Sequence, residues 1–466
     1  MHRDVRLSNN SVTSETKMTD HEECFLKDFF THVANLGYDK AKELVERERE
    51  SRSGQSGPWG MLVIHLPQIA MAERSYGELG FLLTKNKGFL RKDNSLKSIY
   101  ESVRSDFRRV EEVTRMSNTE RLPPSVSNEL RTITAVANEL SLFLTARIEL
   151  IDFLILAFFN FFYYIYEKMH IMGTGKQMRY EELLVQVEDI MDRNAPSVPQ
   201  MCLTPIGNML SLECEVLIHL LRAQLEMQMW RFLPSLMLLH LAHTRLTAWE
   251  SKLQNRESWK LGFGATFLKT SQLPALLQWL MRLKSTFLAK FSLYFYSTLV
   301  MQTTAPEMKT LCSKLQTNDY THKIQNFQRR YDAIAVMLVF DAHGLDDFKG
   351  PGYHHPNKLA EAPKDLECYP IIFSYPIKPL NHMPNVVKII TERASELAAM
   401  DKVVYHFAPR EQSTYIMAST DLRMTLVVIF DSKKAEKETH INNFVFDLAL
   451  QLRCNKVFAN LKPNAK

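Results

Sequence analysis

The spacing of the apolar residues changes near residue 330, and this change limits what the chain can fold into. Before it, apolar residues recur at the helical period of about 3.6, and after it short β-branched runs alternate with amphipathic helices. The sequence therefore predicts an α+β multidomain protein, a large all-α helical bundle followed by a smaller α+β domain. We place these domains at residues 21–316 and 317–466, after a polar tail at residues 1–20 that we expect to be disordered.

The periodicity predicts about ten helices in the first domain, with no repeat that would indicate a solenoid. We expect them at Cys24–Leu36, Tyr38–Arg52, Trp59–Leu83, Ser95–Met116, Glu129–Met172, Tyr180–Met191, Thr204–Phe232, Leu233–Gln254, Pro274–Val300 and Thr304–Leu315. Gly37 is a natural C-cap between the first two helices, and Pro67 is expected to kink the third. Thr304 and Glu307 match a capping box.

The C-terminal part has the element order helix, two strands, helix, three strands, helix. The expected elements are Ile324–Tyr331, Ala333–Phe340, Tyr369–Ser374, Asn385–Met400, Val403–Phe407, Thr414–Ala418, Thr425–Phe430 and Ile441–Leu452. Short connections join the last three strands, so we expect an antiparallel meander. This order is similar to that of roadblock and longin-type modules, small scaffolds that bind GTPases and their regulators, and the similarity is one of fold alone.

Charge and cysteine content narrow the class of protein. The net charge of +5 comes from 57 basic and 52 acidic residues that are interspersed, which argues against a nucleic-acid-binding surface. The six cysteines have no metal-ligand spacing, and Cys202, Cys214 and Cys312 have apolar neighbours, as expected for core residues in a reducing compartment. The N-terminal residues contain no apolar stretch, so we expect no secretory signal.

One apolar run, residues 150–166, approaches the length of a membrane span. Asp152 and Asn160 interrupt it, and the charged residues on its two sides, Arg147 and Glu149 against Glu167 and Lys168, show no sidedness. These features favour a buried helix of a bundle over a transmembrane helix.

The candidate chemical groups are few. His343, His354, His355 and Cys368 lie in one long loop, but their spacing matches no known metal-ligand frame. Asp341 and His343 could form an acid/base pair, yet no nucleophile motif accompanies them.

Two further stretches have some features of a binding site. The segment around Gly262 and Gly264, followed by Lys269 and Thr270, lacks the register of a phosphate loop. The aromatic-rich helix at residues 276–300 could lie on a membrane, but its apolar residues surround it, which favours a core helix or a partner-helix surface. We therefore assign no catalytic, cofactor-binding or metal-ligating residue and no cofactor.

Several long runs together resemble one family, the KICSTOR complex subunit 2 family. The matching runs are YDKAKELVERERE (38–50), FLPSLMLLHLAHTRLTAWE (232–250), LAKFSLYFYSTLVMQTTAPEMKTL (288–311), GYHHP (352–356), EAPKDLECYP (361–370), PNVVKIITER (384–393), TLVVIFDSKK (425–434) and KVFANLKP (456–463). The resemblance covers nearly everything from Cys24 to the C-terminus. Colinear matches of this length are far more specific than a short motif.

The resemblance implies a non-enzymatic scaffold subunit whose partners are the large protein Szt2, kaptin and an integrin-FG-GAP-repeat protein. It implies that the assembly sits on the cytoplasmic surface of lysosomes and recruits the GATOR complex. It further implies negative regulation of TOR complex 1 when amino acids or glucose are scarce. Membrane association would be peripheral and indirect, through the complex.

The chain departs from the family pattern at the tail and at residues 154–165, LILAFFNFFYYI, which are interposed between Asp152-Phe153 and Tyr166-Glu167. Twelve helical residues add about 18 Å and a phase error of about 120°. The insert therefore loops out, extends the helix beyond the bundle, or results from a gene-model error. Detection of peptides across residues 154–165 in the native protein would remove the last alternative.

Two other functions stay open from the sequence alone. The roadblock-like order suggests a module that binds or regulates a GTPase on its own. A hydrolase or metal enzyme using the loop from His343 to Cys368 is the third alternative, and elemental analysis of the purified protein tests it.

Overall fold

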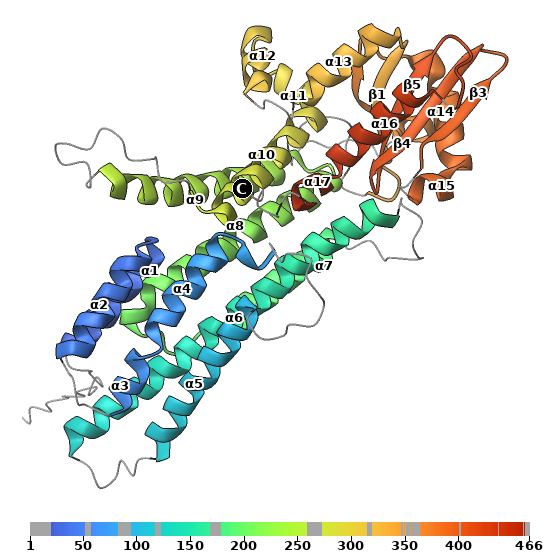
Figure 1. The fold of residues 1–466 in the computed structure, drawn as a ribbon. Helices are drawn as coiled ribbons and strands as arrows, with labels where there is room; N and C mark the ends of the chain where they lie inside the picture. Colours follow the sequence, from blue (N-terminus) through green and yellow to red (C-terminus); the bar gives the residue numbers. More distant parts are fainter. Residues whose placement is uncertain are drawn as a thin grey trace, which may run out of the picture. The chain divides into compact units, whose positions relative to one another are not determined.

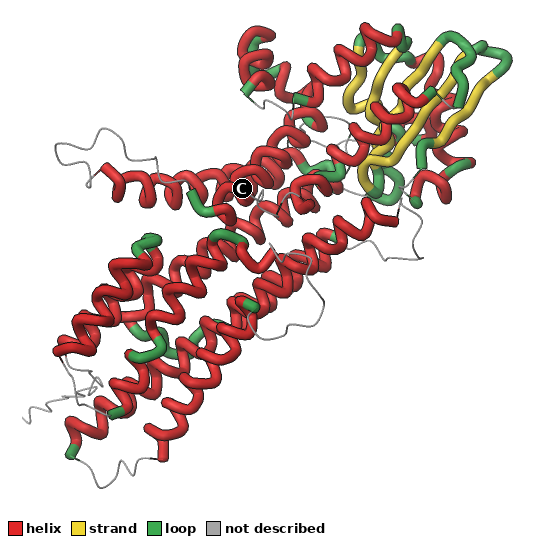
Figure 2. The backbone as a smooth tube through the Cα atoms, in the orientation of Figure 1, coloured by secondary structure: helices red, strands yellow, loops and turns green. Residues whose placement is uncertain are grey.

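The structure is a computed structural model that describes residues 20–51, 57–82, 95–116, 123–167, 179–258, 273–314, 319–345, 348, 350, 355, 364–399, 402–436, 438–459 and 461. The described part is mostly helical and carries one five-stranded antiparallel sheet near the C-terminus (Figure 2). The predicted combination of a helical part and a C-terminal α+β part is thus confirmed. The expected tail lies outside the described residues except for Asp20, and the boundary at residues 316/317 stays a prediction.

By contacts in space, the chain divides into two compact units. Unit 1 contains Met1–Tyr76, Thr84–Ile151 and Ile190–Ser211, and unit 2 contains Gly77–Leu83, Asp152–Asp189 and Leu212–Lys466. Each unit is described by itself below, with the element labels of Figure 1.

Unit 1 is built from helices. They are α1 (Asp20–Ala34), α2 (Tyr38–Ser51), α3 (Pro58–Val63), α4 (Leu66–Gly77), α5 (Leu96–Met116), the first part of α6 (Pro124–Glu167), the short η3 (Met201–Leu203) and the start of α8 (Thr204–Gln228). The predicted kink at Pro67 is a full break, because α3 ends at Val63 and α4 begins just before the proline. Proline lacks an amide hydrogen and is tolerated in the first turn of a helix.

The end of α1 corrects the expected role of Gly37. The residue with positive φ is Leu36 (φ 59°), whereas Gly37 donates its amide to the His32 carbonyl at 2.7 Å. Together with the bond from the Leu36 amide to the Val33 carbonyl, this is a Schellman motif with leucine in the position that glycine usually takes.

The helices of unit 2 precede its sheet in the sequence. They are α7 (Tyr180–Arg193), most of α8, α9 (Phe232–Ser258), α10 (Ala275–Tyr294), α11 (Tyr296–Val300), α12 (Ala305–Ser313) and α13 (Tyr320–Tyr331). The single helix predicted at 274–300 is broken at Phe295 into α10 and α11. The capping box is confirmed: the Thr304 amide donates to Glu307 Oε2 at 2.9 Å, and the Glu307 amide donates to Thr304 Oγ1 at 3.4 Å.

The sheet has the strand order β2-β1-β5-β4-β3, and each pair is antiparallel. The strands are β1 (Ala335–Phe340), β2 (Ile371–Tyr375), β3 (Val404–Ala408), β4 (Ser413–Asp421) and β5 (Met424–Phe430), with α14 (Met383–Glu392) and α15 (Ala394–Ala398) between β2 and β3. Two helices, α16 (Thr439–Leu452) and α17 (Asn455–Ala459), follow the last strand. The predicted meander and element order are therefore present, whereas the break after α14, the short η5 (Asp365–Cys368) and η6 (Leu380–His382), and the final α17 were not predicted.

Helices cover both faces of the sheet. Side chains at alternate strand positions, among them Met337, Tyr415 and Val427, join Val386 and Ile389 of α14 in one core. On the other face α16 packs on β4 and β5, and α13 packs on β1 and β2 (Figure 1). Every residue of β1, β4 and β5 is consequently buried, which explains the continuous apolar run that identified β1 in the sequence.

Helix α6 continues without interruption from Pro124 to Glu167, so residues 154–165 do not loop out of the helix. Phe153, Leu154 and Phe158 are buried, and Leu156 is 40% exposed.

Among the described residues, one helix, Met201–Gln228, is apolar and long enough to cross a bilayer, with 44% of its most apolar window buried. Core helices of globular proteins meet the same criterion.

Candidate functional site

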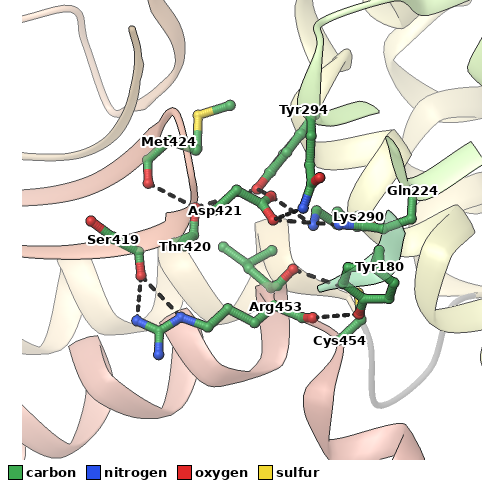
Figure 3. Close-up of polar contacts among 12 residues, drawn as sticks. Tyr180, Gln224, Lys290, Tyr294, Ser419, Thr420, Asp421, Met424, Arg453 and Cys454 are labelled. Atoms are coloured by element: carbon green, nitrogen blue, oxygen red, sulfur yellow. Dashed lines mark hydrogen bonds and ion pairs between the residues drawn. The ribbon is translucent and has the colours of Figure 1, made fainter. Parts of the chain in front are cut away.

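The most concentrated polar chemistry of unit 2 is a buried cluster at the β4–β5 hairpin (Figure 3). The hairpin turns at Leu422 and Arg423, and the strand register shifts between Ser419 and Asp421. Consecutive strand residues normally point to opposite faces, but a bulge re-aims them. Here both Thr420 and Asp421 contact the Tyr294 hydroxyl of α10. The bulge thus brings a carboxylate to the helices.

Asp421 is held by two helices at once. Its Oδ2 lies 2.7 Å from Lys290 Nζ and accepts a hydrogen bond from the Tyr294 hydroxyl at 2.5 Å. Its Oδ1 accepts hydrogen bonds from the side-chain amides of Gln224 at 3.4 Å and Gln228 at 3.1 Å. Both carboxylate oxygens are therefore saturated by donors from α8 and α10.

This ion pair lies deep in the protein. The Lys290 side chain is 0% exposed and that of Asp421 is 5% exposed. Burial, and secondly the negative charge of Asp421, raise the pKa of Tyr294 well above its ordinary value, so its hydroxyl remains a donor at neutral pH. The ammonium also lies 5.2 Å from the centre of the Tyr294 ring, a cation–π contact. Such a pair is tolerated in a dry interior only when partners surround both charges.

A second set of contacts fixes the end of α16 to the same strand. Arg453 donates from Nη2 at 2.5 Å and from Nε at 3.2 Å to the Ser419 carbonyl. The Arg453 carbonyl in turn accepts from the Tyr180 hydroxyl of α7 at 2.8 Å. Next to it, burial raises the pKa of the Cys454 thiol to about 12, so this thiol is not a nucleophile.

Aromatic rings line the helix–sheet contact beside the cluster. Trp230, at the end of α8, lies 4.6 Å from Phe295 and 5.3 Å from Phe340 of β1 between ring centres. It adopts a positive φ of 58° within a Schellman motif, in which the Arg231 amide donates to the Glu226 carbonyl at 2.9 Å. A bulky residue keeps this conformation only where packing determines it.

Unit 1 has its own buried polar cluster. Arg147 of α6 donates from Nε and Nη2 to the two carboxylate oxygens of Glu73 in α4, each at 3.0 Å. The Tyr100 hydroxyl of α5 donates to the same carboxylate at 2.7 Å, and burial raises the pKa of Tyr100 well above its ordinary value. The Tyr76 ring stacks on the guanidinium at 4.3 Å. Arg147, taken from the sequence as a flank of an apolar run, is instead the centre of this core.

These arrangements can hold elements together, because the carboxylates of Asp421 and Glu73 accept from donors on neighbouring helices. In unit 2 the cluster joins α7, α8 and α10 to the hairpin and to α16. In unit 1 the cluster joins α4, α5 and α6. Both clusters therefore fix neighbouring elements to one another.

The residues that the sequence offered for chemistry are placed as follows. His343 Nδ1 and the His343 amide both contact Asp341 Oδ1, at 2.7 and 3.0 Å, so these two residues form a turn on the protein surface. Cys368 ends η5, and its carbonyl accepts from the Ala342 amide at 2.9 Å. Arg423 Nη1 donates to the Asp341 and His343 carbonyls, which ties this turn to the hairpin.

His355 is described and exposed, whereas His354, Gly262, Gly264, Lys269 and Thr270 lie outside the described residues. Within the described ranges, no group of three or more His, Cys, Asp or Glu side chains could hold a metal ion. The described cysteines 24, 202, 214, 368 and 454 are free thiols, and Cys202 and Cys214 are buried as predicted.

The sequence analysis missed the pairing of Lys290 with Asp421. Lys290 lies in the aromatic-rich helix at residues 276–300, whose sequence alone does not show where its cations point. The available signal was a lysine on the buried face of a helix together with an aspartate at the end of an apolar strand, because a fully buried lysine requires a carboxylate partner.

Comparisons with known proteins identify the family of the chain. A family model described as "KICSTOR complex C12orf66 like" matches residues 15–466. A KICSTOR subunit 2 of Xenopus laevis is 37% identical over 450 residues, which is 96% of this chain and 97% of the relative. A KICSTOR subunit 2 of Danio rerio is 37% identical over 464 residues, 97% of this chain and 98% of the relative. The chain therefore belongs to the KICSTOR complex C12orf66-like family.

Proposed function

We propose that the chain is a non-catalytic scaffold or adaptor subunit of a KICSTOR complex. In this proposal the complex recruits the GATOR complex to the lysosomal surface and restrains TOR complex 1 when amino acids or glucose are scarce. The observation that carries it is the match to KICSTOR subunit 2 proteins along nearly the full length of both chains. The buried polar clusters support it, because their contacts join elements to one another.

The partners are proposed to be Szt2, kaptin, the integrin-FG-GAP-repeat subunit and, through the assembly, GATOR. Affinity purification of the full-length tagged chain, expressed at its native level, tests this. We expect the three KICSTOR subunits to be recovered together. Recovery of neither Szt2 nor kaptin would contradict the proposal.

The lysosomal location is proposed to be peripheral and to depend on the rest of the complex. Fractionation of cells with and without Szt2 tests this dependence. We expect the chain to leave the lysosomal fraction when Szt2 is absent. A chain that stays with lysosomes in such cells would bind them by itself, which this proposal does not allow.

One observation favours a second function, direct binding or regulation of a GTPase. The order helix-ββ-helix-βββ-helix is present in the structure, and from the sequence this order suggests a module of the roadblock or longin type. This function predicts that the purified chain alone binds a Rag-type GTPase with an affinity that depends on the bound nucleotide. If the chain binds the GDP-bound and the GTP-analogue-bound GTPase equally, or binds neither, this second function is contradicted and only the adaptor function remains.

A further inference from the structure

The outer face of α9 exposes apolar side chains in a regular row. Ser235, Leu239 and Leu246 are buried on its inner face. On the outer face Leu233 is 43% exposed, Met237 57% and Leu241 41%. Residues four apart stand above one another on a helix, so these three form one continuous row.

Two further leucines extend this row towards α10. The helices α9 and α10 lie side by side and antiparallel, because Phe232 contacts Phe291 and Phe295 while His243 Nδ1 lies 3.4 Å from Lys284 Nζ (Figure 1). Leu288 of α10 lies within this paired stretch. Leu236 and Leu288 are 37% and 38% exposed. We call Leu233, Leu236, Met237, Leu241 and Leu288 the α9 ridge.

The stretches of α9 and α10 that carry the ridge contain basic residues but no acidic ones. No aspartate or glutamate occurs in residues 232–249 or in residues 275–306, which include nearly all of the α9 and α10 surface that carries the ridge. The same stretches contain Arg245, Arg282, Lys284 and Lys290, besides two histidines. Arg245 pairs with Glu215 at 2.8 Å and Lys290 pairs with Asp421, which leaves Arg282 and Lys284. Of these two, Lys284 lies beside His243 at the edge of the ridge.

We propose that the α9 ridge binds an amphipathic helix of another protein subunit, whose apolar face is flanked by acidic residues. A row of residues at i, i+4 and i+8 is the surface against which a partner helix packs its own ridges. A carboxylate on that helix next to Lys284 would meet a cation on which one acid of α9, Glu250, already acts electrostatically. This inference rests on the proposed function as a complex subunit.

Two other occupants fit less well. In a symmetric dimer a second copy of this chain would place its own ridge, whose helix stretches contain no acidic residue, against Lys284. An anionic membrane selects clusters of about four to eight Lys or Arg residues beside an apolar helix face. The ridge has one lysine, Lys284, at its edge, which is far fewer basic residues than such a cluster contains.

The test compares two matched double variants of the tagged full-length chain. Met237→Glu/Leu241→Glu places two carboxylates on the ridge. Val185→Glu/Leu311→Glu makes the same kind of change at apolar residues that are 53% and 49% exposed on α7 and α12. All four side chains are exposed, so both variants are expected to keep the wild-type circular dichroism spectrum and melting temperature. Lys284→Glu is the second ridge variant, which changes charge and leaves the apolar row intact.

The readout is recovery of KICSTOR subunits from cells, followed by carbodiimide crosslinking, which joins an amine to a carboxylate in direct contact. We expect the ridge variant to recover one subunit at least tenfold less than the control variant does. In the wild-type complex, Lys284 should be linked to an acidic residue in a predicted helix of that same subunit. Lys284→Glu should lose both the link and part of the recovery.

Other outcomes overturn the inference. If the ridge variant recovers every subunit like the control, the ridge is not the binding surface, although the proposed function stands. If the wild type recovers no subunit, the proposed function and the inference fail together. Links from Lys284 to a second copy of this chain, or flotation with phosphatidylserine vesicles that the ridge variant loses, would assign the ridge to self-association or to a membrane.

Discussion

At the scale of single residues, we expect the largest loss of stability when the contact between Lys290 and Asp421 is broken. Removing one partner of a buried pair leaves the other charge without compensation, which costs about 3–5 kcal/mol, whereas removing both often costs little. The pair is fully enclosed, and each oxygen of the carboxylate accepts from other donors as well. The main structural role of the pair is therefore to fix the β4–β5 hairpin against α8 and α10.

Asp421→Asn is expected to lower the free energy of unfolding by about 3–5 kcal/mol, because Lys290 loses its counter-charge. Lys290→Met combined with Asp421→Asn should recover a large share of that loss. Urea unfolding of the full chain measures both. Asp431→Asn, at an exposed aspartate after β5, is the control. Equal destabilisation by the single and the double variant would show that charge compensation is not the cause.

His382 gives the fold a pH dependence. It is buried, its Nδ1 lies 2.9 Å from the Tyr415 hydroxyl, and burial lowers its pKa. The unfolded chain therefore takes up this proton at a higher pH than the folded chain does. The resulting stability is complete above the unfolded pKa of about 6.5 and is lost as pH falls through the folded-state value.

We expect His382→Asn to show a smaller loss of stability between pH 7 and pH 5 than the wild type. Thermal melting across that range measures the difference. His440→Asn, at an exposed histidine, should leave the wild-type slope unchanged. A steeper slope for His382→Asn would mean that the protonated form is the stabilised one.

At the scale of elements, the sequence predicted most helices and all five strands to within a few residues. The capping box of α12 and the apolar run of β1 were recognised because their signals are local. The break at Phe295 was not, since its residues are all good core residues and the break follows from aromatic packing with Trp230 and Phe291. The partners of Asp421 were missed for the same reason, because such a pair joins residues far apart in sequence.

The β3–β4 connection contains a residue in a costly conformation. Gln412 has a φ of 49° and is exposed, and its side-chain amide donates to the Pro409 carbonyl at 2.7 Å. A left-handed conformation costs a residue with a Cβ about 1–2 kcal/mol. Glycine does not have this cost, although it loses more entropy on folding.

Gln412→Gly is therefore expected to raise the free energy of unfolding by about 0.5–1 kcal/mol. The neighbouring change Glu411→Gly, at an exposed residue without positive φ, should lower it. The urea concentrations at the unfolding midpoints of the two variants and of the wild type measure these changes. A loss of stability in both would show that the hydrogen bond to Pro409 outweighs the backbone strain.

At the scale of the whole molecule, the α+β part depends on helices that precede it in the sequence. Asp421 uses donors from α8 and α10, Phe340 packs on Trp230, and the Trp279 indole donates to the Val457 carbonyl at 3.0 Å. A chain cut between these groups would expose apolar and charged surfaces together.

The fragment 317–466 expressed alone is expected to aggregate, whereas its co-expression with the fragment 1–316 should yield a soluble pair. Size-exclusion chromatography and co-purification measure this outcome. A monomeric, folded fragment 317–466 would instead make the α+β part an independent domain. The two results show whether residues 317–466 fold independently or only together with the preceding helices.

The bulge at Thr420 has a consequence for how this protein can change over time. Deleting that one residue would leave the hairpin intact but rotate Asp421 to the opposite side of the strand, so the carboxylate would be separated from Lys290. A single lost codon there would thus be more harmful than many point substitutions. Natural variants should tolerate length changes in the surface loops and almost never within this strand end.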